Sequence, residues 1–468
     1  MQRARLIPVS GISSDTEAEQ RASSAFLAVL SIVRDLSIDL LVPFGASRAQ
    51  RALVETFTEA RYKVDGRTIQ PDGLIRVSFG GTSWSALVEV KTSDNLLSAE
   101  QINTYWDLAR IERVNHVLTI SNEIAPMPGV HPTQGLKARS NSPIQVSHLS
   151  WPAILATAIR IKQHRGVSDP EQAWVLGELI RYLEHPASGA LAFGDMGNHW
   201  VEVRDGVRAG TINRKGEGVA DVASRFDQLL RFGALKLGAE IGQDVVPVLS
   251  KPQRDPRARL TYLVDRLSRD GVLDGTLRIP NTAGDVTITA DLRSQQLLAA
   301  LDIDAPADRG GKARATWLAA QLKEARGDLQ IECYSKGARS PHIASLSAVR
   351  DDRAVVIDQQ GRDPARFRLV ARAQMGQGRK AGTKAPGFID TVLGLLTSFY
   401  ETVVQEITPW QPKAPQIKRE AIGEVMPTDQ HDPVPPSPAY VEHRASSGEQ
   451  PPPVADQEAL PEVEGSSA

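Results

Sequence analysis

The sequence PDGLIRVSFGGTSWSALVEVK, at residues 71–91, carries the strongest structural signal of the chain. Apolar and polar residues alternate over 75–79 and, apart from Leu87, over 84–90, on either side of Gly80-Gly81. Paired glycines favour a tight turn because both residues tolerate positive φ. The stretch is therefore predicted to form an antiparallel β-hairpin.

The hairpin brings together residues suited to binding a metal ion. With the turn centred on the two glycines, Asp72 lies across from Glu89, at the separation of about 5 Å that is usual for cross-strand partners; a register shifted by two residues would separate them. Glu89 and Lys91 share a face, because side chains alternate along a strand. Carboxylates bind Mg²⁺, which polarises a phosphodiester and lowers the pKa of a bound water. Lys91 would orient that water or stabilise charge on the phosphate.

A helix follows the hairpin. Ser98-x-x-Gln101 is typical of a capping box and predicts a helix to about Arg113. Gln101 and Tyr105 are four residues apart and therefore lie on one helical face, from which both would reach a phosphate or an attacking water. The alternative is that Glu89 and Lys91 form a solvated strand face and Tyr105 only packs the helix.

The order PD, ExK and QxxxY resembles the PD-(D/E)xK nuclease superfamily, in the RecB-like variant with a QxxxY helix. The resemblance covers 15–165 and implies an α/β restriction-endonuclease-like core of order αβββαβ. It implies that the catalytic residues are Asp72, Glu89, Lys91, Gln101 and Tyr105. It also implies that the side chains of Asp72 and Glu89 and the carbonyl of Val90 bind Mg²⁺ or Mn²⁺.

Many members of this superfamily also place a glutamate on the first helix, which is expected over 16–35. Glu17 and Glu19 are the candidates, and Glu19 is the better spaced as a further metal ligand. The alternative is that Thr16-x-x-Glu19 is itself a capping box.

The remaining elements are predicted from periodicity and turn residues. In the first 165 residues we expect a helix or strand at 50–61, strands at 116–121 and 144–149, and a helix from Trp151. Residues 166–410 are predicted to form one or more α+β domains. Helices are expected at 173–183, 220–232, 254–271, 315–325 and 387–404. Strands are expected at 275–279, 285–292, 329–334 and 367–373, with a hairpin at 200–212.

A basic segment at 362–384 contains seven Lys and Arg against one Asp. It is predicted to be an edge strand that leads into a glycine-rich loop and follows a nucleic-acid backbone. The nucleic-acid-binding candidates are Arg366, Arg368, Arg372, Arg379, Lys380 and Lys384. The alternative is a solvated strand edge that charge protects from aggregation. The RGGKAR sequence at 309–314 lacks the Walker A spacing and is predicted to be a loop that starts a helix.

Composition sets the broad class of the protein. Of its 468 residues only Cys333 is a cysteine, which excludes an intrachain disulfide framework and predicts a buried, apolar role for this residue. Residues 411–468 hold ten acids against four Lys and Arg together with eleven prolines, and are predicted to form a disordered acidic tail. Without this tail the net charge changes from −2 to +4. No apolar run is long enough for a membrane span, which predicts a cytoplasmic protein.

The sequence therefore predicts a Mg²⁺-dependent nuclease that hydrolyses phosphodiester bonds, with DNA as the first choice of substrate and RNA left open. By analogy of fold, such enzymes serve defence, restriction or repair. The alternative is a non-catalytic nucleic-acid- or protein-binding scaffold in a stress response that retains the nuclease fold. A protein partner and self-association both remain open, as does the choice between endonuclease and exonuclease.

Overall fold

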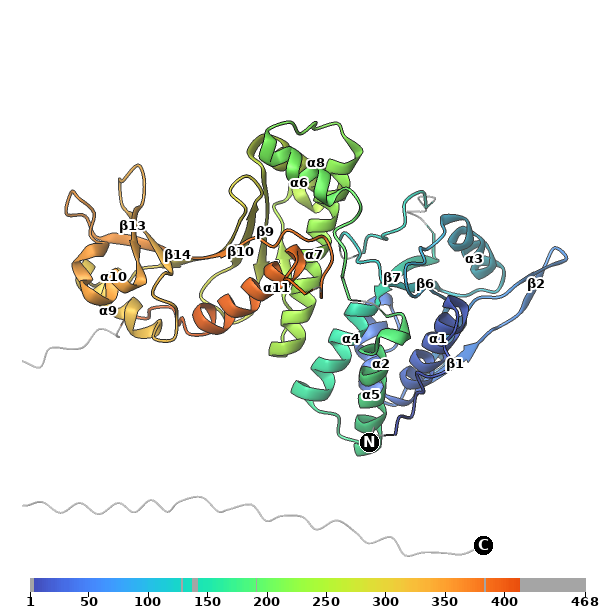
Figure 1. The fold of residues 1–468 in the computed structure, drawn as a ribbon. Coiled ribbons are helices and arrows are strands. Elements are labelled where there is room, and N and C mark those ends of the chain that lie inside the picture. The colour runs from blue at the N-terminus through green and yellow to red at the C-terminus, as the bar shows by residue number, and fades with distance from the viewer. Residues whose placement is uncertain (1–3, 128, 137–141, 191, 383, 413–468) are drawn as a thin grey trace, which may run out of the picture. The chain divides into compact units, whose positions relative to one another are not determined.

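The computed structural model describes residues 4–127, 129–136, 142–190, 192–382 and 384–412. The fold is mixed α/β, with a five-stranded mixed sheet, a seven-stranded antiparallel sheet and a two-stranded hairpin (Figure 1). Residues up to Pro412 form one compact unit. The predicted acidic tail lies outside the described residues, except for its first two positions.

The first sheet has the strand order β1-β4-β5-β6-β7. Strand β4 pairs antiparallel with β1 and with β5, whereas β6 pairs parallel with β5 and with β7. The elements of this region are α1 (Asp15–Ile32), α2 (Arg34–Leu41), β1 (Leu53–Thr58), β2 (Tyr62–Val64), β3 (Arg67–Ile69), β4 (Gly73–Phe79), β5 (Thr82–Val90), α3 (Ala99–Ile111), β6 (His116–Ser121), β7 (Gln145–Ser150), α4 (Trp151–Ile159) and α5 (Pro170–Leu183).

The predicted β4–β5 hairpin is confirmed in both turn and register. Gly80 and Gly81 form a two-residue turn with φ of 56° and 81°. Phe79 pairs with Thr82 at the turn, and Gly73 pairs with Val88 at the far end. One step beyond that last pair, the same register sets residue 72 across from residue 89.

This turn makes a testable prediction about Gly80. A Cβ at this position meets no atom within 4 Å, so only backbone conformation opposes a side chain. Asparagine tolerates the left-handed region, whereas a β-branched residue does not. We expect Gly80→Val to lower the free energy of unfolding by about 1–2 kcal/mol and Gly80→Asn to change it far less. Thermal or urea unfolding of both variants checks this, and an equal effect would contradict a left-handed turn.

Helices cover both faces of the first sheet. On one face, Val88 and Val90 pack in a core with α1, α4 and α5 that includes Phe26 and Trp151. On the other face, Leu87 packs with α3 and β6. Because side chains alternate along β5, Glu89 and Lys91 lie on the α3 face with Leu87. Helix α5 belongs to the first core, although it follows residue 165, where the sequence places the end of the nuclease-like domain.

The second sheet has the strand order β13-β12-β14-β11-β10-β9-β8, in an α+β region as predicted. Its elements are α6 (Trp200–Ala209), α7 (Glu217–Ile241), β8 (Val246–Val248), α8 (Pro256–Asp270), β9 (Val272–Arg278), β10 (Val286–Asp291), β11 (Gln296–Asp304), α9 (Gly311–Gln321), β12 (Gln330–Ser335), β13 (His342–Ser345), α10 (Leu346–Asp351), β14 (Pro364–Gln374) and α11 (Phe388–Phe399). Cys333 is buried in β12, and Gly310 caps α9, both as expected.

Two predictions for this region are wrong. The segment 200–212 is not a hairpin, because α6 occupies most of it and buries Trp200, Val203 and Val207, whose spacing is helical. Strand β14 is not at an edge, because it pairs with β12 on one side and β11 on the other. No helix in the described residues is both long and apolar enough to cross a membrane.

Candidate metal and phosphodiester site

Asp72 and Glu89 form the centre of the candidate site. β4 begins only at Gly73, so the Val90 N–H lacks a strand partner there and donates instead to Asp72 Oδ2, at 2.7 Å. The Glu89 side chain is 1% exposed, and neither of its oxygens accepts a hydrogen bond of normal geometry from the described residues. Burial, reinforced by the charge of Asp72, raises the pKa of Glu89 to about 7. Burial also raises the pKa of Asp72. The two carboxylates therefore lie where a cation would stabilise them.

Lys91 supplies part of that positive charge. Its Nζ lies 2.8 Å from Glu89 Oε1 and 3.3 Å from Glu19 Oε2. Burial acts to lower the pKa of Lys91, but the close contact with the Glu89 carboxylate and the charge of this group outweigh burial and raise this pKa. Asn95, which the sequence did not single out, donates from Nδ2 to Glu19 Oε1 at 2.8 Å.

The capping-box interpretation of Glu19 is wrong. Helix α1 begins two residues earlier than that box requires, with Ser14 as the N-cap that accepts from the Glu17 N–H. The Glu17 carboxylate in turn accepts from the hydroxyl and N–H of Ser13, each at 2.7 Å. Glu17 therefore caps the helix, which leaves Glu19 free to pair with Lys91. Whether Glu19 also binds a metal stays a prediction.

The QxxxY residues lie on one face of α3, as predicted. Ser98 caps this helix and accepts from the Gln101 N–H. Gln101 Nε2 donates to the Tyr105 hydroxyl at 3.1 Å, and this hydroxyl donates to the Gln70 carbonyl at 3.2 Å. Burial, and then the charge of Glu89, raise the pKa of Tyr105. Tyr105 thus holds the backbone two residues before Asp72, which makes it a positioning residue.

The Tyr105→Phe variant tests this role. It removes two part-buried hydrogen bonds, the one from Gln101 and the one to the Gln70 carbonyl, a loss of about 1–2 kcal/mol in the free energy of unfolding. For the phosphodiester cleavage that the sequence predicts, we expect the rate to fall about 10-fold or less, well short of the loss in Lys91→Ala. Parallel rate measurements on both variants check the order, and a larger loss in Tyr105→Phe would mean that the hydroxyl acts on the reacting groups directly.

The donor atoms fit a hard divalent cation. The Lys91 N–H donates to the Ile120 carbonyl on β6, so the N–H and C=O of Val90 face the opposite side, toward Asp72. Two carboxylates and one carbonyl are thus available, and Mg²⁺ commonly keeps waters in its other positions. Where the chain is described, no group of three or more His, Cys, Asp or Glu has the arrangement of a metal site. The protein therefore offers two carboxylates and one backbone carbonyl, and waters would fill the remaining coordination positions of the cation.

A polar hollow of about 470 Å³ opens beside Asp72. One wall is α1, with Gln20 and Ser24, and the other is formed by residues 58–59 and 70–72. Amide, hydroxyl and carboxylate groups dominate this lining, as expected for a hollow that receives a polar substrate rather than an apolar ligand.

Two histidines near the sheet, His131 and His148, are held by hydrogen bonds. Thr119 is the parallel partner of Glu89, and its hydroxyl lies 2.7 Å from His131 Nε2 and 2.9 Å from His148 Nδ1. His148 Nε2 also bonds the Glu123 carbonyl at 2.8 Å. Burial lowers the pKa of His131 to about 4 and that of His148 to about 3, so both rings are neutral at pH 7. Each ring nitrogen of His131 and His148 therefore has a hydrogen-bond partner among the described residues.

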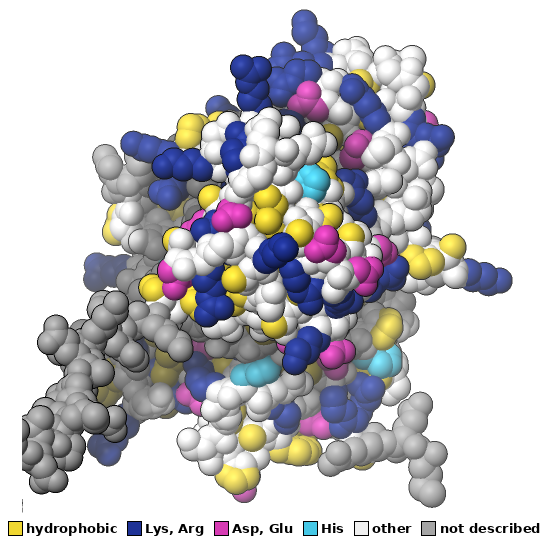
Figure 2. Space-filling view, turned by 90° about the vertical axis from the view of Figure 1, so that its left-hand side faces the viewer, with side chains coloured by type: hydrophobic (Ala, Val, Ile, Leu, Met, Phe, Trp, Pro, Cys, Tyr) yellow, Lys and Arg dark blue, Asp and Glu magenta, His cyan; other side chains and the backbone are white. Residues whose placement is uncertain are grey.

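The basic residues of 362–384 mostly have partners. Arg366 and Arg368 each pair with Asp302 at 3.1 Å, and Arg372 donates to Gln330 and Gln296. The further contacts are those of Arg379 with Asn198 and Asp195, and a backbone bridge between Lys380 and Asp195, whereas Lys384 is exposed. Figure 2 shows Lys and Arg interspersed with Asp and Glu on one face of the molecule rather than gathered in a single patch. A nucleic-acid role for this segment stays a prediction.

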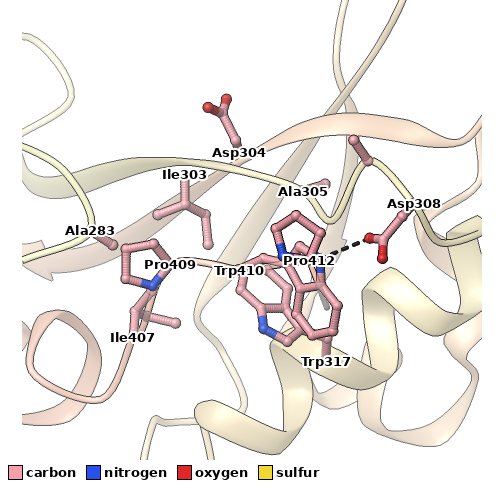
Figure 3. Close-up of a pocket in the computed structure, with 11 residues that line it drawn as sticks. Ala283, Ile303, Asp304, Ala305, Asp308, Trp317, Ile407, Pro409, Trp410 and Pro412 are labelled. Atoms are coloured by element: carbon pink, nitrogen blue, oxygen red, sulfur yellow. Dashed lines mark hydrogen bonds between the residues drawn. The ribbon is translucent and has the colours of Figure 1, made fainter. Parts of the chain in front are cut away.

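A second hollow, of about 380 Å³, lies beside α9 (Figure 3). Its walls include Trp317 and Trp410, whose rings meet edge to face. Asp308 accepts a 2.8 Å hydrogen bond from the Trp410 indole, and the Asp304 carboxylate points away from the rings. Because its acids are engaged or turned outward, this hollow does not offer the paired carboxylates that phosphodiester chemistry requires.

No protein-family model, curated protein or solved structure matches the chain.

Proposed function

We propose that this protein is a Mg²⁺-dependent nuclease of the PD-(D/E)xK type that hydrolyses phosphodiester bonds in DNA. The observation that carries the proposal is the convergence of Asp72, Glu89 and Lys91 at the end of the β4–β5 hairpin. The element order supports it as well, because α1, β1, β4, β5, α3 and β6 follow the αβββαβ order that the resemblance implies, with α2 and the β2–β3 hairpin as additions.

Each residue has a distinct task in this proposal. Asp72, Glu89 and the Val90 carbonyl would hold the divalent cation, which when bound polarises the phosphodiester and lowers the pKa of the attacking water. Lys91, held between two carboxylates, carries a positive charge at the reacting phosphate and stabilises the negative charge that builds there. Tyr105 and Gln101 fix the backbone that carries Asp72.

Asp72→Asn is the variant that separates catalysis from folding. Asparagine keeps an oxygen to accept from the Val90 N–H but lacks the negative charge, whereas alanine would leave that buried N–H unpaired, a cost of about 1–3 kcal/mol. Linear and circular, single- and double-stranded DNA, with matched RNA, would be incubated with Mg²⁺, Mn²⁺ or a chelator.

We expect cutting that requires the metal and is lost in Asp72→Asn. The metal-free variant should unfold at a temperature no lower than that of wild type, because loss of the Asp72 charge removes its repulsion of Glu89. Cutting of circular substrates would identify an endonuclease. A preference for RNA would mean that RNA, not DNA, is the substrate. If DNA binding is insensitive to Mg²⁺ and nothing is cut, the non-catalytic scaffold replaces this proposal.

A further inference from the structure

Between β1 and β4 the chain leaves the sheet as the β2–β3 hairpin, here called the arm (residues 60–71). Figure 1 shows it projecting beyond the sheet, where it is labelled β2. Its turn is Asp65-Gly66, with φ of 50° and 75°. At its base the Glu59 N–H donates to the Asp72 carbonyl at 3.3 Å. The arm therefore ends directly before Asp72 of the candidate metal site, and the residue before the arm is hydrogen-bonded to Asp72.

The arm is held in place by packing on one of its faces. Tyr62, Val64 and Ile69 pack against the core that includes α3. Arg61 Nε bonds the Gln70 side chain at 3.2 Å, and the Gln70 carbonyl accepts from Tyr105. These contacts fix the position of the arm relative to α3 and Asp72.

The arm is basic and exposed. Residues 60–71 contain Arg61, Lys63 and Arg67 against one acid, Asp65, and all three cations are exposed. None of the three forms an ion pair with a carboxylate among the residues that the structure describes. Elsewhere the exposed Arg278, for example, is matched by Asp285. Clustered cations without acidic partners repel one another, which favours an anionic partner.

We propose that the arm holds the DNA backbone beside the phosphodiester that is cut. This inference rests on the proposed nuclease function. Lys63 lies four residues along the strand from Glu59, a reach of about 13 Å at 3.3 Å per residue. A duplex rises 3.4 Å per base pair, so the arm contacts phosphates within roughly four base pairs of the cut. Such contacts position the DNA without recognising its sequence. The counterions that they release from the phosphates make binding more favourable.

The test compares two double variants of the full chain with equal changes of charge. Lys63→Ala with Arg67→Ala alters the arm. Lys336→Ala with Arg339→Ala alters the connection between β12 and β13, where both cations are also exposed. Binding of one duplex DNA is measured against salt concentration in chelator, and cleavage kinetics are measured in Mg²⁺.

We expect the arm variant to reduce the slope of log affinity against log salt by about 2, one for each lost phosphate contact. KM should rise, kcat at saturating DNA should stay near its wild-type value, and the control variant should match wild type. Equal salt slopes in the arm variant and wild type would overturn the DNA-binding role of the arm, while metal-dependent cutting would still support the nuclease function. DNA binding that depends on the arm, without cutting in any metal, would overturn the nuclease function and support the role of the arm. Failure of wild type to bind DNA would overturn both proposals.

Discussion

Lys91→Ala is expected to slow DNA cleavage by at least about 100-fold, the loss typical when one preorganised donor to a developing charge is removed. The Lys91 ammonium contacts Glu89 and Glu19, and no other described side chain places a cation between them. Folding should be retained, because Lys91 is 19% exposed and a proton on Glu89 can replace its charge. Single-turnover rates at saturating DNA and Mg²⁺ measure the effect.

A lysine in the same region provides the matched control. Lys162 Nζ donates to the Ala173 carbonyl at 2.8 Å, so Lys162→Ala also removes a partnered lysine. It should cut DNA at the wild-type rate. Lys91→Arg keeps the charge but not the compact ammonium, and should recover only part of the activity. If Lys91→Ala is unfolded at the assay temperature, Lys91 has a structural role. If it cuts DNA at a rate within a few-fold of wild type, Lys91 takes no part in the reaction.

Glu89→Gln is expected to stabilise the metal-free protein at pH 8 and to abolish both cleavage and stabilisation by Mg²⁺. In wild type at this pH the buried Glu89 carboxylate is ionised beside Asp72, which is unfavourable without a cation. A pKa raised from 4.5 to about 7 corresponds to a gain on the order of 3 kcal/mol when this charge is removed. Lys91 keeps Glu19 as its partner in the variant.

The pH dependence has a definite sign. Because the pKa of Glu89 is higher in the folded state, this group takes up a proton on folding between about pH 4.5 and 7. Its contribution to the stability of the metal-free protein is therefore greatest below about pH 4.5 and is lost as the pH rises to about 7. Thermal unfolding from pH 5 to 8, with chelator or Mg²⁺, should show this loss in wild type and not in Glu89→Gln.

The exposed glutamate Glu59 provides the control, since Glu59→Gln should keep both the pH dependence and the stabilisation by Mg²⁺. An unchanged response of Glu89→Gln to Mg²⁺ would mean that Glu89 does not bind the metal.

The parts of the candidate site that follow from local sequence were predictable. A Gly-Gly turn fixes which residues of its two strands pair, so the opposition of residues 72 and 89 follows from residues 71–91 alone. Helical periodicity likewise places Gln101 beside Tyr105.

Features that depend on distant partners were not predictable. Glu19 could be assigned to the site only once Ser14 was seen to cap α1, because two overlapping capping patterns compete in that stretch. The alternation at 200–212 resembled a strand because the spacing of its valines fits the two-residue period of a strand as well as the period of a helix. Only the burial of Trp200 in the core shows that the segment is a helix. The central place of β14 depends on pairing with β11 and β12, which are distant in sequence.

The most direct test of the central claim is the rate at which wild-type protein cuts duplex DNA in Mg²⁺, compared with the same reaction in chelator and with Asp72→Asn in Mg²⁺. Cutting is expected only from wild type with the metal, and metal-free Asp72→Asn is expected to unfold at a temperature no lower than that of metal-free wild type. Equal rates for wild type and Asp72→Asn, or cutting that persists in chelator, would contradict the central claim.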